Sequence, residues 1–124
     1  MTFIDQHFII TGGASGLGLA TVQYFLTLGA NISIFDLNEC DINDKKLYIQ
    51  YVDVSDELKV KEAVKAAVIK FGNINGLINC AGIGSAQKLI SSKQIHSSTL
   101  FEKVLQINLF GTFHCNRYVA KEMK

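Results

Sequence analysis

Short apolar runs alternate with runs of helical periodicity along most of this 124-residue chain. Each apolar run is bounded by glycine, asparagine, aspartate or polar residues, which is typical of a buried strand. Apolar residues at every third or fourth position are typical of helices that cover a sheet. The expected strands are 8–10, 31–35, 47–52 and 75–80, and the expected helices are 19–28, 56–71 and 99–124. This alternation predicts an α/β fold with a parallel sheet.

Two of the expected helices have a defined apolar face and end at a glycine. Gly29 follows the first helix, where a left-handed C-terminal residue is favoured, and Gly72 follows the second. Ser55 is expected to cap the start of the second helix, with acidic residues in its first turn. The apolar face of the first helix is Leu17, Ala20, Tyr24 and Leu28, and that of the second is Val60, Ala63, Val64, Ala67 and Phe71.

The last expected helix begins at a capping box, Thr99–Glu102, and can run to Lys124. A helix that is apolar on most sides is buried on most sides, so one side is expected to meet the sheet and the other a second subunit. Asn108 falls on the first of two stripes, where a buried amide must satisfy its hydrogen bonds. The stripes are Phe101, Leu105, Thr112, Cys115 and Val119, and Leu100, Val104, Ile107, Gly111 and Tyr118.

A glycine-rich stretch, Thr11–Gly18, joins the first strand to the first helix. Glycine lets the backbone approach a pyrophosphate closely, and the helix N-terminus that follows supplies free N–H groups. The spacing excludes a Walker A loop, because Leu19 stands where the phosphate-binding lysine is required. The stretch therefore predicts a phosphate site, whereas the same glycines without the strand and helix would indicate only a turn.

Two aspartates follow strands at positions where ligands of open α/β sheets bind. Asp36 ends the second strand about 20 residues beyond the glycine stretch, where a carboxylate can accept hydrogen bonds from ribose hydroxyls and repel a 2′-phosphate. This favours NAD over NADP, although an aspartate that merely caps a turn is the alternative. Asp53 follows the third strand, and turn capping is again the competing interpretation.

Composition and charge narrow the classes of function. Twelve Lys and Arg against eleven Asp and Glu give a net charge of +1, and there is no basic cluster, so nucleic acid is not an expected partner. Cys40, Cys80 and Cys115 are odd in number and widely spaced, which argues against a disulfide framework or a Cys-x-x-Cys metal site. The sequence has no signal-peptide pattern and no apolar run of membrane-spanning length. We therefore expect a cytoplasmic protein with no metal site and no membrane partner.

Together the motifs resemble the short-chain dehydrogenase/reductase family. Thr11–Gly18 resembles the Thr-Gly-x-x-x-Gly-x-Gly loop of that family, and Asn79–Gly82 stands where the family carries Asn-Asn-Ala-Gly. Asp36, Asp53 and Asn108 also occur in the family's order and spacing. Within the family, the chain looks most like the type 2 3-hydroxyacyl-CoA dehydrogenases in the segments 12–21, 79–83 and 104–113.

The resemblance implies a single NAD-binding domain over residues 1–124. Its fold would be a truncated Rossmann-like, doubly wound parallel sheet with strand order 3-2-1-4 and a long C-terminal helix. The resemblance also implies that Asp53 bonds the adenine amino group and that Asn108 holds a water in the catalytic proton relay. A core amide bonded only to local backbone is the alternative for Asn108. The residues implied to bind NAD are Gly12, Ser15, Gly16, Leu17, Gly18, Asp36, Asp53, Val54, Cys80, Ala81 and Gly82.

Cys80 departs from the commonest form of the family motif, which has asparagine at this position. A reactive thiol is one interpretation. No His, Lys or Arg is adjacent in sequence to lower the pKa of the thiol, so a small buried side chain is preferred.

The catalytic serine and the Tyr-x-x-x-Lys pair of the family follow the helix on which this chain ends. None of Tyr24, Tyr48, Tyr51 and Tyr118 has a lysine four positions later. Two hypotheses follow. The chain is the cofactor-binding portion of an NAD-dependent oxidoreductase that acts on a hydroxyl, ketone or acyl-CoA substrate, inactive alone and assembled as a homo-oligomer through helix 100–123. Alternatively, it is a non-catalytic nucleotide-binding or scaffold domain.

Overall fold

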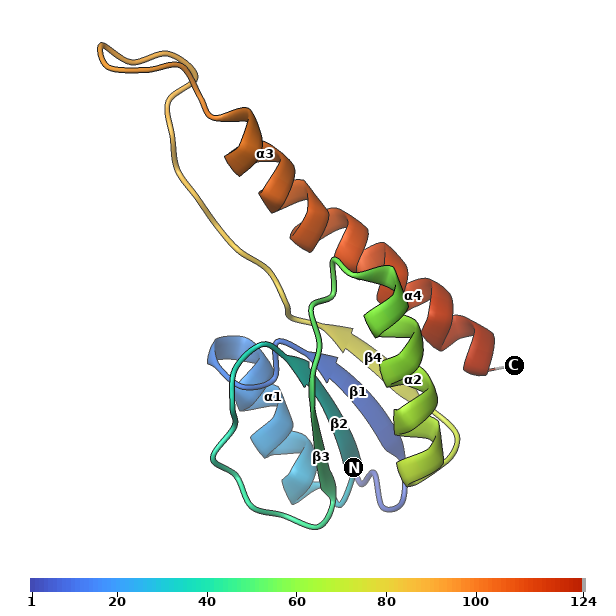
Figure 1. The fold of residues 1–124 in the computed structure, drawn as a ribbon. Helices are drawn as coiled ribbons and strands as arrows, with labels where there is room; N and C mark the ends of the chain where they lie inside the picture. The colour runs from blue at the N-terminus through green and yellow to red at the C-terminus, as the bar shows by residue number, and fades with distance from the viewer. Residues whose placement is uncertain (124) are drawn as a thin grey trace.

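A four-stranded parallel sheet with helices on both faces forms the body of the computed structural model, which describes residues 1–123 (Figure 1). The strand order β3-β2-β1-β4 confirms the predicted order 3-2-1-4. The strands are β1 (His7–Thr11), β2 (Asn31–Asp36), β3 (Leu47–Tyr51) and β4 (Gly76–Asn79). The helices are α1 (Gly16–Thr27), α2 (Glu57–Phe71), α3 (Ser98–Leu105), the π-helix η1 (Gln106–Phe110) and α4 (Gly111–Glu122).

The two faces of the sheet bury two separate apolar clusters. All five residues of β1 are buried, as expected for a central parallel strand covered on both sides. On one face, Ile10, Ile32 and Ile34 pack with Val22 of α1. On the other face, α2 and α4 cover β1 and β2 through a cluster that consists of Ile9, Phe35, Val52, Val54, Val60, Ala63, Val64, Ala67, Ile74, Cys115 and Val119.

Helix α1 presents a different face to the sheet from the one predicted. Gly18 and Val22 are its buried residues, whereas Leu17 and Tyr24 of the predicted stripe are 84% and 55% exposed. The physical reason is the glycine loop, because any side chain at position 18 would collide with the backbone of Gly12. Close approach of the helix to the loop therefore sets its rotation. Gly29 has the predicted left-handed backbone, with φ of 87°.

Helix α2 buries the predicted residues Val60, Ala63, Val64 and Ala67, but its cap differs. Asp56 is the N-cap, and its carboxylate accepts a hydrogen bond from the Lys59 N–H at 3.2 Å. Ser55, the predicted cap, instead donates its hydroxyl hydrogen to Asp53 at 2.6 Å. The prediction of a serine cap was wrong because the aspartate two residues earlier competes for that hydroxyl.

The C-terminal helix is continuous from Ser98 but includes the π-helical turn η1. Ser97 caps it by accepting a hydrogen bond from the Leu100 N–H at 3.2 Å, so the predicted capping box at Thr99 was wrong. The predicted contact of one side of the helix with the sheet is present in α4, whereas its predicted contact with a second subunit stays a prediction. Helix α3 buries no residue, because only α4 lies on the sheet, and the predicted end at Lys124 lies outside the described residues.

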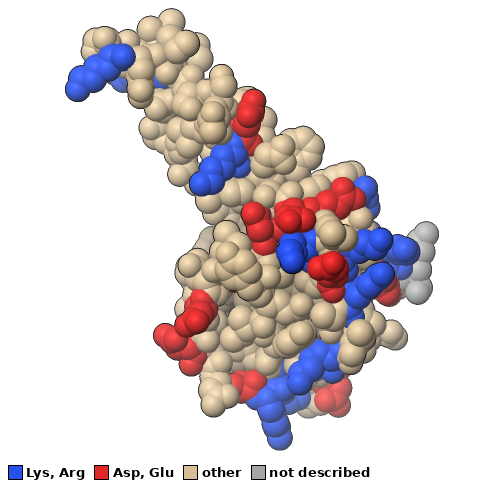
Figure 2. All heavy atoms as spheres, in the orientation of Figure 1, with Lys and Arg blue, Asp and Glu red and all other residues tan. Residues whose placement is uncertain are grey.

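Residues 83–105 form an arm that projects away from the sheet (Figure 1). It consists of the long polar connection after β4, which includes one bridge between Ile90 and Ile95, followed by α3. On the face shown in Figure 2, this arm carries few charged side chains. The sheet and its helices thus form the body of the molecule, and the arm extends from the end of β4.

Candidate functional site

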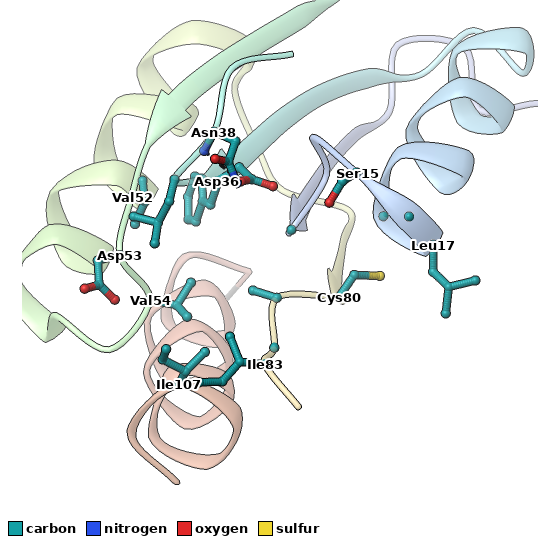
Figure 3. Close-up of a pocket in the computed structure, with 17 residues that line it drawn as sticks. Ser15, Leu17, Asp36, Asn38, Val52, Asp53, Val54, Cys80, Ile83 and Ile107 are labelled. Carbon is teal, nitrogen blue, oxygen red and sulfur yellow. Dashed lines mark hydrogen bonds between the residues drawn. The ribbon is translucent and has the colours of Figure 1, made fainter. Parts of the chain in front are cut away.

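A cavity of about 350 Å³ opens where the carboxyl ends of all four strands meet (Figure 3). Ligands of open parallel sheets bind at this end. The structure brings every residue of the predicted cofactor-binding set to the wall of this one cavity. The lining residues are Gly12, Ser15, Gly16, Leu17, Gly18, Phe35, Asp36, Leu37, Asn38, Val52, Asp53, Val54, Cys80, Ala81, Gly82, Ile83 and Ile107.

The glycine loop forms one wall of the cavity, between β1 and α1. Gly12 has φ of 67°, and a Cβ there would lie 2.7 Å from the backbone nitrogen of Ala81. The loop therefore lies directly against the segment after β4, which only glycine permits. Ser15 is the N-cap of α1, but its side chain makes no capping hydrogen bond. This leaves a hydroxyl and the first N–H groups of a 12-residue helix beside the cavity, a favourable arrangement for an anion.

Asp36 lies at the end of β2 and connects two loops of the cavity wall. One carboxylate oxygen accepts a hydrogen bond from the Ala14 N–H at 2.9 Å, and the other accepts one from the Asn38 N–H at 2.9 Å. The Asn38 side-chain amide also donates to the carboxylate, at 3.4 Å, and since a carboxylate has about four acceptor sites, capacity remains for a hydroxyl donor of a ligand. Asp36 thus caps a turn, which was the alternative to ligand binding in the sequence analysis, and it also lines the cavity.

Asp53 and Val54 form the wall that follows β3. Asp53 accepts hydrogen bonds from both the N–H and the hydroxyl of Ser55, at 2.9 and 2.6 Å, so it does cap the turn before α2. The same residue lines the cavity and remains partly exposed. Turn capping and ligand contact are therefore compatible at this position.

The segment after β4 is attached to the end of β1 by a threonine. The Thr11 hydroxyl oxygen accepts hydrogen bonds from the N–H groups of Cys80 and Ala81, at 3.1 and 3.0 Å. This fixes Cys80–Gly82 along the cavity with small side chains toward it. Cys80 is partly exposed rather than buried, so the predicted burial was wrong, because the cavity itself leaves its side chain open.

Asn108 lies beside the cavity but does not line it. Its amide oxygen accepts a hydrogen bond from the Ile83 N–H at 2.8 Å, and its amide nitrogen donates to the Ile83 carbonyl at 2.7 Å. The side chain is exposed, so its predicted burial was wrong, since it lies at the π-turn η1, where the helix leaves the sheet. Both hydrogen bonds reach backbone 25 residues away, and they fix Ile83 at the mouth of the cavity.

The structure adds apolar and amide residues that the sequence analysis did not single out. Ile83 of the arm and Ile107 of η1 both line the cavity and are drawn at the same end of it, and Asn38 lies beside Asp36 (Figure 3). Asn38 follows Asp36 by two residues, a spacing typical of an aspartate turn, which could have indicated it. Ile107 was named only as a member of an apolar stripe of the helix, and no local pattern connects that stripe to the cavity.

The charged side chains that line the cavity are both acidic. Asp36 and Asp53 line it, and among the described residues that line it there is no lysine or arginine. The single arginine of the sequence, Arg117, does not line the cavity and instead bonds Glu57 at the start of α2, as does Tyr118. Hydrogen bonds from these two side chains lower the pKa of Glu57, and the same Glu57 contact raises the pKa of Tyr118.

Within residues 1–123, no three His, Cys, Asp or Glu side chains are grouped so that they could hold a metal ion. In the same part of the chain, no helix combines the length and apolarity that crossing a membrane requires.

Comparison with known proteins places these features in context. The family model for short chain dehydrogenases matches residues 6–124. The human 3-hydroxyacyl-CoA dehydrogenase type-2 is 42% identical over 123 residues, which cover 93% of this chain and 47% of that protein. Ipsdienol dehydrogenase of Ips pini is 37% identical over 119 residues, 91% of this chain and 47% of that protein.

A solved structure agrees with the same grouping. The ligand-free aldohexose dehydrogenase of Thermoplasma acidophilum superposes with a TM-score of 0.88 at 25% identity, over 98% of this chain and 45% of that one. The chain thus spans about half the length of the relatives it matches.

Proposed function

The chain belongs to the short chain dehydrogenase family, and on this basis we propose that residues 1–124 form a single NAD(H)-binding domain of a cytoplasmic oxidoreductase. The observation that carries the proposal is the cavity at the carboxyl ends of the strands, because the glycine loop, both aspartates and the segment after β4 all line it. In a complete enzyme, the reaction would move a hydride between the nicotinamide and a hydroxyl or ketone group. The similarity to 3-hydroxyacyl-CoA dehydrogenase type-2 favours an acyl-CoA substrate.

The residues present fit a nicotinamide dinucleotide. Gly12 and Gly18 let the loop pack against Ala81 and the start of α1 pack against the loop, since a Cβ at either position would collide with that backbone, whereas Gly16 borders open space. In this proposal, the loop and the start of α1 hold the pyrophosphate and Asp36 accepts from the adenosine ribose hydroxyls. Asp53 and Val54 hold the adenine, and Cys80–Gly82 support the second ribose and the nicotinamide.

Bound cofactor would supply the hydride, and the chain's own residues would orient it. Asn108 would hold a water in a proton relay, with the Ile83 backbone as its fixed partner. The sequence has no tyrosine followed by a lysine four positions later, so the proton donor of the family has no counterpart here.

The cofactor proposal predicts a preference for NAD(H) over NADP(H). Asp36 repels a 2′-phosphate, and the next residue, Leu37, offers it no positive charge. Calorimetric titration should give at least about tenfold tighter binding of NAD(H), and Asp36→Ala should reduce that preference. Asp41→Ala, an exposed carboxylate in the same connection after β2, is the control. Equal or tighter NADP(H) binding by the unsubstituted chain would contradict the proposal.

A second candidate is a non-catalytic nucleotide-binding or scaffold domain, since the cavity would hold a nucleotide and no tyrosine among residues 1–124 has a lysine four positions later. Both candidates predict that the 124-residue chain shows no hydride transfer with acetoacetyl-CoA and NADH, since no residue can donate the proton. Mass-verified chain with a steady NADH-dependent rate would refute this.

A downstream Tyr-x-x-x-Lys in the encoding reading frame separates the two candidates. If it is present, the longer protein should be active, and Asn108→Ala should lower its turnover more than its affinity for cofactor. If the frame contains none and the expressed protein binds NAD(H) without turnover, the scaffold candidate stands.

A further inference from the structure

We infer that His114 of α4 is a positioning residue for the cofactor, because it holds the Val54 wall of the cavity by a hydrogen bond to its backbone. This inference rests on the proposed function. His114 does not line the cavity, so it would act through Val54.

The contact joins two buried groups. His114 Nδ1 lies 3.0 Å from the Val54 carbonyl oxygen. His114 is 9% exposed and Val54 is 6% exposed. A carbonyl can only accept, so Nδ1 carries the hydrogen, and this contact fixes which ring nitrogen is the donor. Loss of this donor would leave a buried carbonyl without its partner, which is a costly arrangement.

Gly111, one turn before His114, reaches the same residue from the same helix. A Cβ at Gly111 would lie 2.5 Å from Cγ2 of Val54, so the helix backbone lies directly against that side chain. The backbone of Gly111 thus contacts the Val54 side chain while His114 binds its carbonyl. Two adjacent contacts of α4 therefore fix both the side chain and the peptide of a wall residue.

Other side chains of α4 account for the packing of the helix. Cys115 and Val119 are buried in the core cluster between the sheet and α2, and Tyr118 and Arg117 bond Glu57 at the start of α2. None of these four lines the cavity, and in the described residues none makes a hydrogen bond to Val54, although Cys115 and Val119 share its apolar cluster. The His114 bond is thus the polar contact through which α4 reaches the wall next to Asp53, the proposed adenine partner.

Four variants of the full chain test this inference, with NAD(H) affinity measured by calorimetry and folding checked by circular dichroism. His114→Leu replaces the imidazole with an apolar side chain that has no donor, and should bind NAD(H) about five- to tenfold more weakly. His114→Asn keeps an N–H near Nδ1 and should stay within about twofold of the unsubstituted chain. Tyr118→Phe, which removes another α4 contact that does not reach the cavity, is the matched control and should not change the affinity. Gly111→Ala should displace Val54 without removing the His114 hydrogen bond. It replaces His114→Leu in the test if that variant does not fold.

A second readout separates positioning from loss of folded protein. Nicotinamide hypoxanthine dinucleotide lacks the adenine amino group, so its affinity does not depend on that contact of Asp53. His114→Leu should narrow the preference for NAD(H) over this analogue, whereas a smaller folded fraction would weaken both equally. If folded His114→Leu keeps the NAD(H) affinity and the preference over the analogue, the inference about His114 is wrong while the proposed function stands. If His114→Leu does not fold, the same result for Gly111→Ala decides against the inference. No NAD(H) binding by the unsubstituted chain would overturn the proposed function with it.

Discussion

His7, at the start of the central strand, is a fully buried imidazole that connects three parts of the fold. One ring nitrogen lies 3.1 Å from the Gly72 carbonyl after α2, and the other lies 2.8 Å from the Ser33 hydroxyl of β2. The carbonyl requires a hydrogen on Nδ1, so the neutral ring accepts from Ser33 at Nε2. Burial lowers the pKa of His7 below its ordinary value of 6.5, while the bond to Gly72 opposes this shift in part.

Acid should therefore destabilise the protein through His7. Below pH 6.5 the unfolded chain binds a proton at this residue while the folded state resists it, so stability falls as the pH is lowered through the folded pKa. Between pH 6.5 and the folded pKa, His7 lowers the free energy of unfolding by at most about 1.4 kcal/mol per pH unit. Urea unfolding between pH 7.5 and 5 should show a smaller loss for His7→Gln than for the unsubstituted chain. His96→Gln, a histidine on the projecting arm, is the control. Identical pH dependence in His7→Gln and the unsubstituted chain would contradict the prediction.

At the scale of elements, the C-terminal helix combines two environments that differ in stability. Helix α4 buries Gly111, His114, Cys115 and Val119, whereas α3 buries nothing. Between them, η1 adds one residue to a turn, and such π-helical turns are frequent at functional sites. Here η1 carries Ile107 to the cavity and Asn108 to the Ile83 backbone. The helix is thus anchored to the site at its centre and unsupported by a core at its start.

The first turn of α3 should depend on its cap. Ser97→Ala removes the hydrogen bond to the Leu100 N–H, and loss of such a cap costs about 1 kcal/mol. Amide hydrogen exchange of α3 should then accelerate about fivefold, because local opening sets the rate there. Thr99→Ala, two residues later and exposed, should leave the exchange rate unchanged. Faster exchange in Thr99→Ala and an unchanged rate in Ser97→Ala would instead support the capping box that the sequence predicted at Thr99.

Prediction from sequence succeeded for elements and their order, and failed for details fixed by contacts between distant residues. The strands were recognisable because central parallel strands are continuously apolar, and the cavity set followed from the glycine loop and strand-end aspartates. The rotation of α1 was not recognisable, since the contact of Gly18 with Gly12 overrides its apolar stripe. The His114 contact was also missed, because 60 residues separate His114 from Val54 and no local pattern connects them.

At the scale of the whole molecule, two surfaces are left without a partner in the described chain. Strand β4 pairs only with β1, so its outer edge presents backbone groups that can pair with another chain. Phe101, Leu109 and Phe113 are large apolar residues exposed on the C-terminal helix. These features support the prediction that the chain assembles as a homo-oligomer, through the helix, the strand edge or both.

Light scattering over a dilution series should therefore report a dimer or larger species at micromolar concentration. Leu109→Asp, at a position that is 60% exposed on the helix, should shift the population toward monomer if the helix forms the contact. Ile69→Asp, at a position that is 87% exposed on α2, is the matched control for an added charge. A monomeric unsubstituted chain would mean that neither surface drives self-association.

The pairing of β1 with β4 also governs how the cavity must arise during folding. In the register of the sheet, Phe8 lies opposite Gly76 but also opposite Ile32, so the β1–β2 pairing closes a much shorter loop than the β1–β4 pairing. Long loops cost more entropy to close, and contacts of high sequence separation slow folding. The unit β1-α1-β2, with the glycine loop and Asp36, is therefore expected to form early, and the wall from Cys80 to Ile83 late. The complete nucleotide site exists only after β4 has joined the sheet. Added nucleotide should therefore lower the rate of unfolding more than it raises the rate of folding.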